Sequence, residues 1–478
     1  MDILFVASEL APTVKAGGLA DVVAALAKAL RLLGHTVTLA LPRYPQIEAS
    51  GILVARRLTP VVLGEGDHRT EVTLFDGRLS SGVGLLLVDG PGLFDRPGVY
   101  GEAGVDYPDN ARRFGTFCRA VTEVVAQRAA SGAPFDIVHA HDWPTALVPY
   151  LMRLRPQLAS TRTVVTIHNL AHQGIFPPSA LGDLGLSPEH MHPDKLEFYG
   201  NVNCLKAGLV AADGLTTVST TYAREIQTPE RGERLDGLLR AKGDRLVGIV
   251  NGIDYAVWNP SIDPALAARY DAEDIGNKGR CKSSLLSELG LRIDPERPLV
   301  VSLGRLVPQK GSDVLAAAMP RLLKNDIAVV VAGSGDAAIA DKLGATVAKA
   351  PERAAFLGAV SEATSHRLLA AADLVLVPSR FEPCGLVQLY AQRYGAVPIA
   401  TRTGGLVDTV VDLDAALETG TGFLFDGPTV DELVGAVQRA LSAMTSPRWP
   451  TVRRRVMRLD LGWDRPARRY AQLYRSFA

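Results

Sequence analysis

The sequence contains little cysteine, and its cysteines stand far apart. Only four occur in 478 residues, and none belongs to a CxxC pair. They are Cys118, Cys204, Cys281 and Cys384. This spacing indicates neither a disulfide framework nor a structural zinc site. We therefore expect a protein of the reducing cytoplasm.

Net charge and long apolar runs are also missing. Lys+Arg and Asp+Glu are equal at 51 each, so we expect neither nucleic acid nor a membrane as the main partner. No run reaches the roughly 18 apolar residues of a membrane span, and Ile3–Ala7 is too short for a signal peptide. With 47% apolar and 21% charged residues, the composition is that of a soluble globular protein. Its length predicts two or three domains.

Several common motifs are absent as well. Without GxGxxG, GxxxxGK[ST] or GxSxG, the chain is not expected to be a nicotinamide-dinucleotide enzyme, a P-loop NTPase or a serine hydrolase. His139 and His141 form an HxH pair, but no Asp, Glu or Cys joins it at metal-ligand spacing. We therefore expect no metal site.

Short Val/Ile/Leu runs alternate with helical patterns along the whole chain. In the first half they are Ile3–Ala7, Thr36–Leu41, Gly84–Val88, Ile137–Ala140, Thr163–Ile167 and Gly214–Val218. In the second half they are Leu299–Leu303, Ile327–Ala332, Ala354–Leu357, Leu374–Val377 and Val397–Ala400. Such alternation is typical of βαβ units and parallel sheets. The predicted fold class is α/β, with two doubly wound, Rossmann-like domains.

The domain boundary is predicted at a strand that ends in an Asn-Gly turn, Leu246–Asp254. This gives a first domain over 1–248 and a second over 249–455, followed by a helical segment over 456–478. A repeated motif supports two similar domains, because Ala16–Asp21 and Thr403–Asp408 both contain Gly-Gly-Leu-x-Asp after a strand and before a helix. In such folds ligands bind beyond the carboxyl ends of the strands.

The turn Pro378–Leu386 combines a carboxylate, a thiol and a glycine between a strand and a helical pattern that begins at Gly385. Free N–H groups at such a helix start favour an anion, for example a diphosphate. A carboxylate beside an anion needs a neutral partner, so we predict that Glu382 binds a polyhydroxyl group next to the diphosphate. The alternative is a plain strand–loop–helix joint with an exposed glutamate.

Cations follow two of the predicted strands. Arg305 and Lys310 come after Leu299–Leu303 and suit a clamp on a diphosphate leaving group. Lys15 precedes Gly17 and Gly18, which allow the backbone to approach a ligand closely. A basic surface loop and a glycine turn needed only for packing are the respective alternatives.

Polar residues follow two further strands. Asp142 and His168 each lie just past a strand end, where we expect them to face a ligand cleft. Tyr100 belongs to an aromatic, polar loop of a kind that stacks on sugar rings. An ordinary surface loop would have the same sequence.

These motifs together resemble those of the bacterial glycogen synthases and plant starch synthases. The matching segments are Lys15–Leu19, His141–Trp143, Thr166–Asn169, Asn251–Asp254, Arg305–Gly311, Pro378–Leu386 and Arg402–Leu406. The resemblance implies a GT-B glycosyltransferase with a deep cleft between its domains. It places the glucan acceptor on residues 1–248 and the nucleotide sugar on 249–455, and it implies that the last helix crosses back to the first domain.

The resemblance also implies a reaction. Glucose would pass from ADP-glucose to the non-reducing end of an α-1,4-glucan such as a glycogen primer, with retention and with neither a metal nor pyridoxal phosphate. The implied catalytic residues are Glu382, Arg305, Lys310, Asp142 and His168. The implied substrate-binding residues are Lys15, Gly17, Gly18, Asp21, Asn251, Cys384, Gly385, Leu386 and Tyr100. A front-face mechanism, in which the leaving phosphate deprotonates the acceptor, suits the scarcity of catalytic acids.

Two positions distinguish the chain from related enzymes. Tyr390 follows Glu382 by eight positions, as in these synthases, where other retaining GT-B transferases often have a second Glu. Val360 stands where the family usually has an aromatic residue that would stack on the nucleotide base. The rival hypotheses are a sucrose synthase-like or phosphorylase-like enzyme and a non-catalytic glucan-binding protein. The presence of Lys15, Arg305, Lys310 and Glu382 together favours an enzyme.

Overall fold

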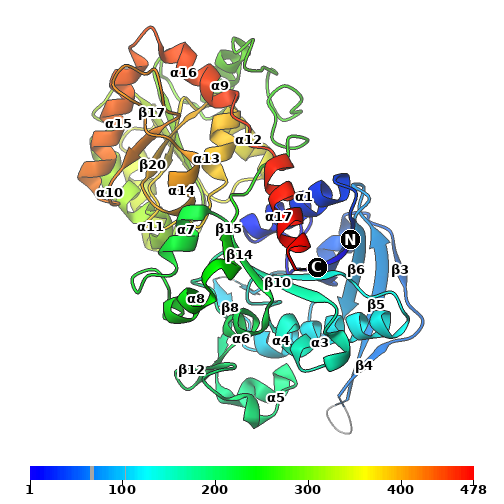
Figure 1. Ribbon diagram of the computed structural model, residues 1–478. Coiled ribbons are helices and arrows are strands. Elements are labelled where there is room, and N and C mark those ends of the chain that lie inside the picture. The colour runs from blue at the N-terminus through cyan, green and yellow to red at the C-terminus, as the bar shows by residue number, and fades with distance from the viewer. Residues whose placement is uncertain (65–68, 103, 478) are drawn as a thin grey trace. The chain divides into compact units, whose positions relative to one another are not determined.

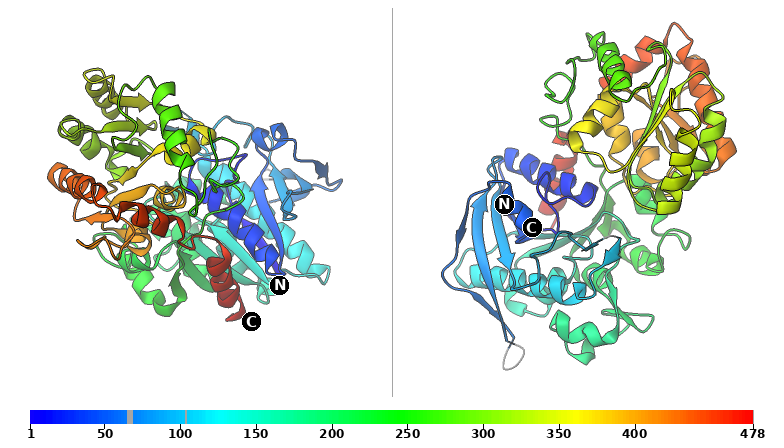
Figure 2. Two further views of the ribbon diagram at one scale, coloured as in Figure 1. Left: turned by 90° about the horizontal axis from the view of Figure 1, so that it is seen from above. Right: turned by 180° about the vertical axis from the view of Figure 1, so that it is seen from behind.

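The computed structural model describes residues 1–64, 69–102 and 104–477. The chain forms two compact units, shown in Figures 1 and 2: the first is Met1–Asn251 with Trp463–Ala478, and the second is Gly252–Gly462. The boundaries thus fall three and seven residues later than the sequence suggested. The second shift arises because α16 (Trp449–Met457) packs Trp449, Val452 and Val456 into the core of the second unit.

The central sheet of the first unit is parallel except at one edge. Its spatial order is β15-β14-β10-β9-β1-β2-β6-β5-β3, with β4 also paired to β5. The parallel strands are β1 (Asp2–Val6), β2 (Thr36–Pro42), β6 (Gly84–Asp89), β9 (Ile137–His141), β10 (Arg162–Ile167), β14 (Gly214–Thr217) and β15 (Leu246–Gly248). The antiparallel edge consists of β3 (Val54–Arg56), β4 (Val61–Leu63) and β5 (Thr70–Arg78). Counted among the parallel strands alone, the order is 3-2-1-4-5-6-7, which is doubly wound.

Helices and small hairpins surround this sheet. The helices are α1 (Gly18–Leu32), α2 (Pro45–Ala49), α3 (Asn110–Ala130), α4 (Leu147–Arg153), α5 (Leu181–Leu184), α6 (Cys204–Ala211), α7 (Thr220–Glu225), α8 (Asp236–Lys242) and α17 (Asp464–Arg475). The short strands are β7 (Gly101–Glu102), β8 (Val105–Asp106), β11 (Ile175–Phe176), β12 (Glu197–Phe198) and β13 (Asn201–Asn203). The long apolar faces of α1 and α3 cover the sheet, as expected for amphipathic helices.

The second unit has a parallel sheet in the order β18-β17-β16-β19-β20-β21. Its strands are β16 (Leu299–Leu303), β17 (Ala328–Ala332), β18 (Ala354–Leu357), β19 (Leu374–Val377), β20 (Val397–Thr401) and β21 (Phe423–Phe425). Its remaining helices are α9 (Asn277–Glu288), α10 (Ser312–Leu322), α11 (Ala337–Val347), α12 (Glu362–Ala371), α13 (Val387–Arg393), α14 (Gly404–Thr409) and α15 (Val430–Met444). Counted along the chain this order is again 3-2-1-4-5-6, so the predicted pair of Rossmann-like sheets is confirmed.

Both faces of the second sheet are covered, which explains why its strands read as continuous apolar runs. Val300 and Leu374 belong to one core cluster, whereas their neighbours Val301 and Val375 belong to the cluster on the opposite face. Successive residues of a strand point to opposite faces, so both sets must be apolar. The sequences of these strands therefore show no alternation of apolar and polar residues.

The arginine-rich end of the chain forms two helices, α16 and α17, where the sequence showed one helical pattern. Ala467, Tyr470, Ala471 and Tyr474 form a buried stripe on α17 at helical spacing. This stripe packs into the core of the first unit, with α17 beside α1 in Figure 1. All four arginines of α17 lie outside this stripe. Among the described helices, none is long and apolar enough to cross a membrane.

Candidate active site

Four of the predicted site residues follow strands that border the point where the strand order reverses in each sheet. In the first unit, β1 precedes Lys15, and its neighbour β9 precedes Asp142. In the second unit, β16 precedes Arg305, and its neighbour β19 precedes Glu382. Open α/β sheets bind ligands at this reversal, because the flanking loops diverge there and leave a crevice.

Glu382 is buried in the second unit, with 4% of its surface exposed. Lys310 Nζ donates to its two carboxylate oxygens at 2.7 and 2.6 Å, and the Ser379 hydroxyl donates to Oε2 at 2.9 Å. A buried carboxylate is stable as an anion when a cation and hydrogen-bond donors surround it. Glu382 is therefore not the exposed side chain that the alternative expected.

Close backbone contacts fix this turn. Gly311 has φ +66°, and a Cβ atom there would lie 1.9 Å from the carbonyl oxygen of Pro378, so only glycine fits. Gly405 N–H donates to the Glu382 carbonyl at 2.9 Å. The loop that carries Lys310 and the second Gly-Gly-Leu loop thus both pack on the turn that holds Glu382.

A cavity of about 90 Å³ opens beside this pair. Its lining includes Ser302, Arg305, Lys310, Glu382 and Gly385. Arg305 is exposed at its mouth. The structure therefore brings the two predicted cations and the predicted carboxylate to one place at the end of β16 and β19.

The helix after Glu382 begins later than the sequence suggested. α13 starts at Val387, with Leu386 as its N-cap, while Gly385 has a left-handed φ of 72°. The side-chain amide of Gln388 donates to the carbonyls of Cys384 and Gly385 and so holds this bend. The bend buries Cys384 and leaves Gly385 and Leu386 half-buried beside the carboxylate.

In the first unit, the Lys15–Gly18 loop is held by a residue that the sequence analysis missed. Glu9 is 3% exposed, and its Oε2 accepts N–H bonds from Ala16 at 2.7 Å and Gly17 at 2.8 Å. Lys15 Nζ donates to Asp21 Oδ1 at 2.8 Å, so these two predicted residues do meet. The Gly17 N–H is thus bonded to Glu9 within the loop itself.

The position of Glu9 contained a usable signal. Ser8-Glu9 directly follows β1, whose carboxyl end borders the reversal point, and an acid at such a strand end is a site candidate. Two of its three partners are backbone N–H groups, which leave no side-chain motif in the sequence. The Tyr100 hydroxyl donates to Glu9 Oε1 at 2.7 Å and lies 2.8 Å from Ser8 Oγ. Tyr100 is thereby attached to the same loop.

Asp142 and His168 lie together at the ends of β9 and β10. Asp142 adopts a left-handed φ of 58°, uncommon for a residue other than glycine, and its Oδ1 accepts the His168 N–H at 2.7 Å. Burial raises the pKa of Asp142 to about 8. Burial also lowers the pKa of His168 to about 3, so its imidazole is neutral at physiological pH. The pair is therefore a fixed polar arrangement with little formal charge.

The HxH pair is buried in the core of the first unit. His139 is fully buried, with its Nδ1 2.7 Å from the Tyr474 hydroxyl and its Nε2 2.6 Å from Thr166 Oγ1. His141 stacks on His139 at 4.2 Å, and its Nδ1 lies 3.0 Å from His168 Nε2. Across the described ranges, no group of three or more His, Cys, Asp or Glu is arranged to hold a metal ion.

Aromatic rings gather near Tyr100. Its ring centroid lies 6.0 Å from Phe114 and 6.3 Å from Trp143, and Trp143 meets Phe176 at 5.7 Å. These rings form an aromatic wall beside the Tyr100 loop, in which Phe114 is 3% exposed.

Asn251 and Val360 are the remaining predicted positions. Asn251 is buried, and its side-chain oxygen finds no partner within the described part of the chain. Val360 is partly buried and packs against the core of the second unit. A buried amide oxygen without a partner is costly, so Asn251 is a candidate for ligand contact.

Comparison with known proteins identifies a family. The model of the starch synthase catalytic domain matches residues 2–241, and that of the glycosyl transferases group 1 matches residues 290–448. A glycogen synthase of Anaeromyxobacter sp. (strain Fw109-5) is 45% identical over the full length of both chains. Glycogen synthase 2 of Geobacter metallireducens is 41% identical and covers 100% of this chain and 99% of its own.

Solved structures agree. The catalytic domain of starch synthase IV from Arabidopsis thaliana, bound to ADP and acarbose, superposes with a TM-score of 0.92 at 34% identity, covering 99% of this chain and 98% of its own. Sucrose-phosphate synthase from Thermosynechococcus elongatus covers 100% of this chain and 98% of its own, with a TM-score of 0.60 and 19% identity, and so shares the fold. The chain belongs to the family of the glycogen and starch synthases, glycosyltransferases of the GT-B fold.

Proposed function

We propose that this protein acts as a glycogen synthase, transferring glucose from ADP-glucose to the non-reducing end of an α-1,4-glucan with retention of configuration. The observation that carries the proposal is the Lys310–Glu382 pair beside Arg305 at the reversal point of the second sheet. The full-length similarity to glycogen synthases supports the reaction and the acceptor. The ADP in the starch synthase IV structure supports the donor.

In the second unit, Arg305 and Lys310 would stabilise the negative charge that develops on the departing diphosphate. Glu382 would accept hydrogen bonds from glucose hydroxyls, since two carboxylate oxygens have more lone pairs than Lys310 and Ser379 occupy. The amides of Gly385 and Leu386, with Cys384 beside them, are assigned to the same ligand. This division suits a donor that is anionic at one end and neutral at the other.

In the first unit, we assign phosphate recognition to Lys15 and to the amide of Gly18. Asp21 positions Lys15 by accepting a hydrogen bond from its Nζ. Asp142, His168 and Asn251 are assigned to orienting the transferred glucose. The unpaired Asn251 oxygen supports this assignment because a sugar hydroxyl would satisfy it.

We further propose that Tyr100 stacks on the acceptor glucan. The aromatic wall beside it supports this role.

We propose a front-face mechanism without metal or pyridoxal phosphate, in which the leaving phosphate takes the proton of the acceptor 4-OH. A double displacement of the kind that retaining glycosidases use would need two carboxylates about 5 Å apart, one of them acting as the nucleophile. If Glu382→Gln trapped a glucosyl group on another carboxylate, the front-face proposal would be wrong. Dialysis against a chelator is expected to leave the rate unchanged.

One assay tests the function. Purified protein is mixed with glycogen and either ADP-glucose or UDP-glucose, and nucleoside diphosphate release is followed. Release with ADP-glucose supports the proposal, and release with neither donor contradicts it. Phosphate-dependent formation of glucose 1-phosphate would favour a phosphorylase. The four free, buried cysteines support our assignment to the cytoplasm.

A further inference from the structure

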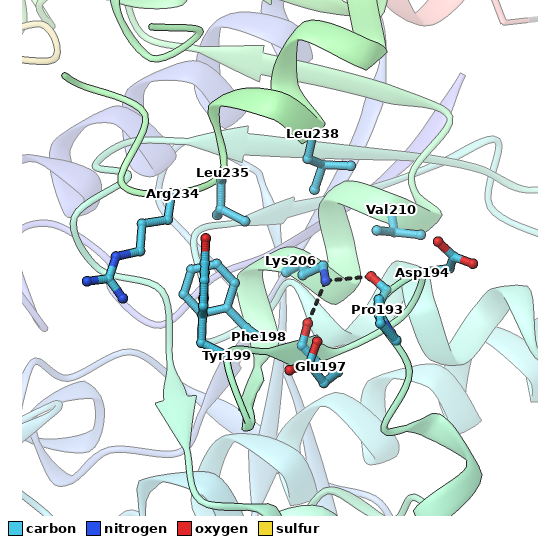
Figure 3. A pocket seen from close by; sticks show the side chains of 10 residues that line it. All are labelled: Pro193, Asp194, Glu197, Phe198, Tyr199, Lys206, Val210, Arg234, Leu235 and Leu238. Carbon is cyan, nitrogen blue, oxygen red and sulfur yellow. Dashed lines mark hydrogen bonds between the residues drawn. The ribbon is translucent and has the colours of Figure 1, made fainter. Parts of the chain in front are cut away.

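The first unit contains a groove that none of the residues assigned above lines. It has a volume of about 630 Å³ and lies between the β12–β13 hairpin and the segment that leads into α8 (Figure 3). Tyr199 and Arg234 stand side by side along it, with Leu238 on one wall and Glu197 and Asp194 toward the other end. Its volume falls within the range of small-molecule sites.

The groove presents an aromatic ring to solvent. Tyr199 is 68% exposed, in a protein that buries most of its large rings. The ring contacts Phe198 edge-on at 4.9 Å, and the Arg234 guanidinium carbon lies 5.2 Å from its centroid. This cation–π contact restrains the Tyr199 ring, which can then serve as a platform for a ligand.

Residues with a left-handed backbone lie on both walls of the groove. Tyr199, Glu233 and Arg234 have positive φ values of 51°, 48° and 65°, which cost free energy in residues other than glycine. The buried Gln173 holds one of these walls, because its side-chain amide donates to the Glu233 carbonyl at 3.1 Å. Lys206 Nζ holds the other by donating to the carbonyls of Pro193 and Glu197. Hydrogen bonds from Gln173 and Lys206 thus fix the strained segments on both walls.

The charges of the lining indicate a neutral ligand. Asp194 and Glu197 balance Lys206 and Arg234, so neither an anion nor a cation gains from the field of the groove. An exposed ring between hydrogen-bonding side chains suits a pyranose, whose C–H face packs on the ring while its hydroxyls contact carboxylates and guanidinium.

We propose that this groove, with Tyr199 as its platform, binds a segment of α-1,4-glucan. The proposal rests on the proposed function, because that reaction uses a polymer much longer than one active site holds. A polymer held in the groove keeps its other chain ends at a high effective concentration near the enzyme. The groove therefore acts on long glucans and is without effect on short ones.

Tyr199→Asn tests this, because asparagine tolerates the left-handed turn and the hairpin should keep its fold. We expect weaker retardation of the variant in native gels that contain glycogen, and a KM for glycogen raised about fivefold. The KM values for maltotriose and ADP-glucose, and kcat, should stay within about twofold, since the groove holds only the polymer. Arg234→Asn should act in the same direction. Leu58→Asn, at a position 99% exposed, is the matched surface control.

Unchanged retardation and unchanged KM for glycogen in both variants would overturn the proposal. A parallel rise of the KM for maltotriose would also overturn it, because the groove would then belong to the reaction site. If the wild-type protein transfers no glucose from either donor, yet Tyr199→Asn still weakens glycogen retardation, the proposed function fails and the glucan groove stands.

Discussion

Glu9 holds the Lys15–Gly18 loop, and changing it should release that loop without unfolding the protein. Its carboxylate accepts two backbone N–H bonds at 2.7 and 2.8 Å and the Tyr100 hydroxyl at 2.7 Å. Glu9→Gln can still place its oxygen toward the two amides and its NH₂ toward the tyrosine hydroxyl, so it loses mainly the charge. Glu9→Ala loses every one of these bonds.

The two variants should therefore give graded effects. Hydrogen bonds to a charged group are worth about 1 kcal/mol more than neutral ones, so Glu9→Gln weakens the loop by about 2 kcal/mol. This corresponds to roughly 30-fold faster hydrogen exchange at the amides of Ala16 and Gly17, if those amides exchange by local opening. Glu9→Ala leaves buried groups unsatisfied and should remove their protection almost completely.

Amide exchange measured by NMR or mass spectrometry checks this, with the KM for ADP-glucose as a second readout. The KM should rise in the same order, because Lys15 lies on the released loop. Tyr100→Phe is the matched control, since it removes the third bond and leaves both amide bonds intact. Equal amide protection in the wild type and in Glu9→Ala would refute the reasoning.

Three other substitutions have definite expectations. Glu382→Gln should lower kcat by about 100-fold or more while binding of ADP alone is retained, because it removes a charged contact to glucose; steady-state rates and ADP titration measure both. Asp142→Asn should remove a pH dependence of folding. Because the pKa of Asp142 is raised to about 8, the free energy of unfolding of the wild type falls as pH rises from about 4 to 8, by up to about 1.4 kcal/mol per pH unit. In urea denaturation the variant should therefore be more stable relative to the wild type at pH 7.5 than at pH 4. Gly311→Ala should destabilise by about 3 kcal/mol or more, because its Cβ would meet Pro378; Gly290→Ala, with the similar φ of +67° and open space, is the thermal-melting control.

Most of the parallel strands could be predicted from the sequence because their residues are buried on both faces of the sheet. Runs such as Leu374–Val377 have no polar alternation, and the structure places one strand at each of the eleven apolar runs named. The ends were less certain: α13 begins two residues after Gly385, because that glycine takes a left-handed turn which apolar spacing does not reveal. Local pattern predicts an element better than its first residue.

The meeting of site residues depends on strand order, which local pattern does not contain. Arg305 and Glu382 are 77 positions apart in the sequence and come together because β16 and β19 are hydrogen-bonded neighbours. Glu9 was missed because it bonds to backbone amides, which every residue type except proline supplies. Side-chain motifs therefore predicted which chemical groups are present. Only the fold showed that the carboxylate of Glu9 binds backbone amides and that of Glu382 binds Lys310.

The repeated Gly-Gly-Leu loop explains why the two glutamates differ. In the first unit the loop bonds to the carboxylate of Glu9, whose oxygens are then occupied by amides and a hydroxyl. In the second unit the corresponding loop bonds to the backbone carbonyl of Glu382, through Gly405. The Glu382 carboxylate is thus left to Lys310, Ser379 and the cavity. The Gly-Gly-Leu motif therefore occupies the carboxylate of Glu9 in the first unit and leaves the carboxylate of Glu382 accessible to a ligand in the second. This difference supports our assignment of sugar recognition to Glu382.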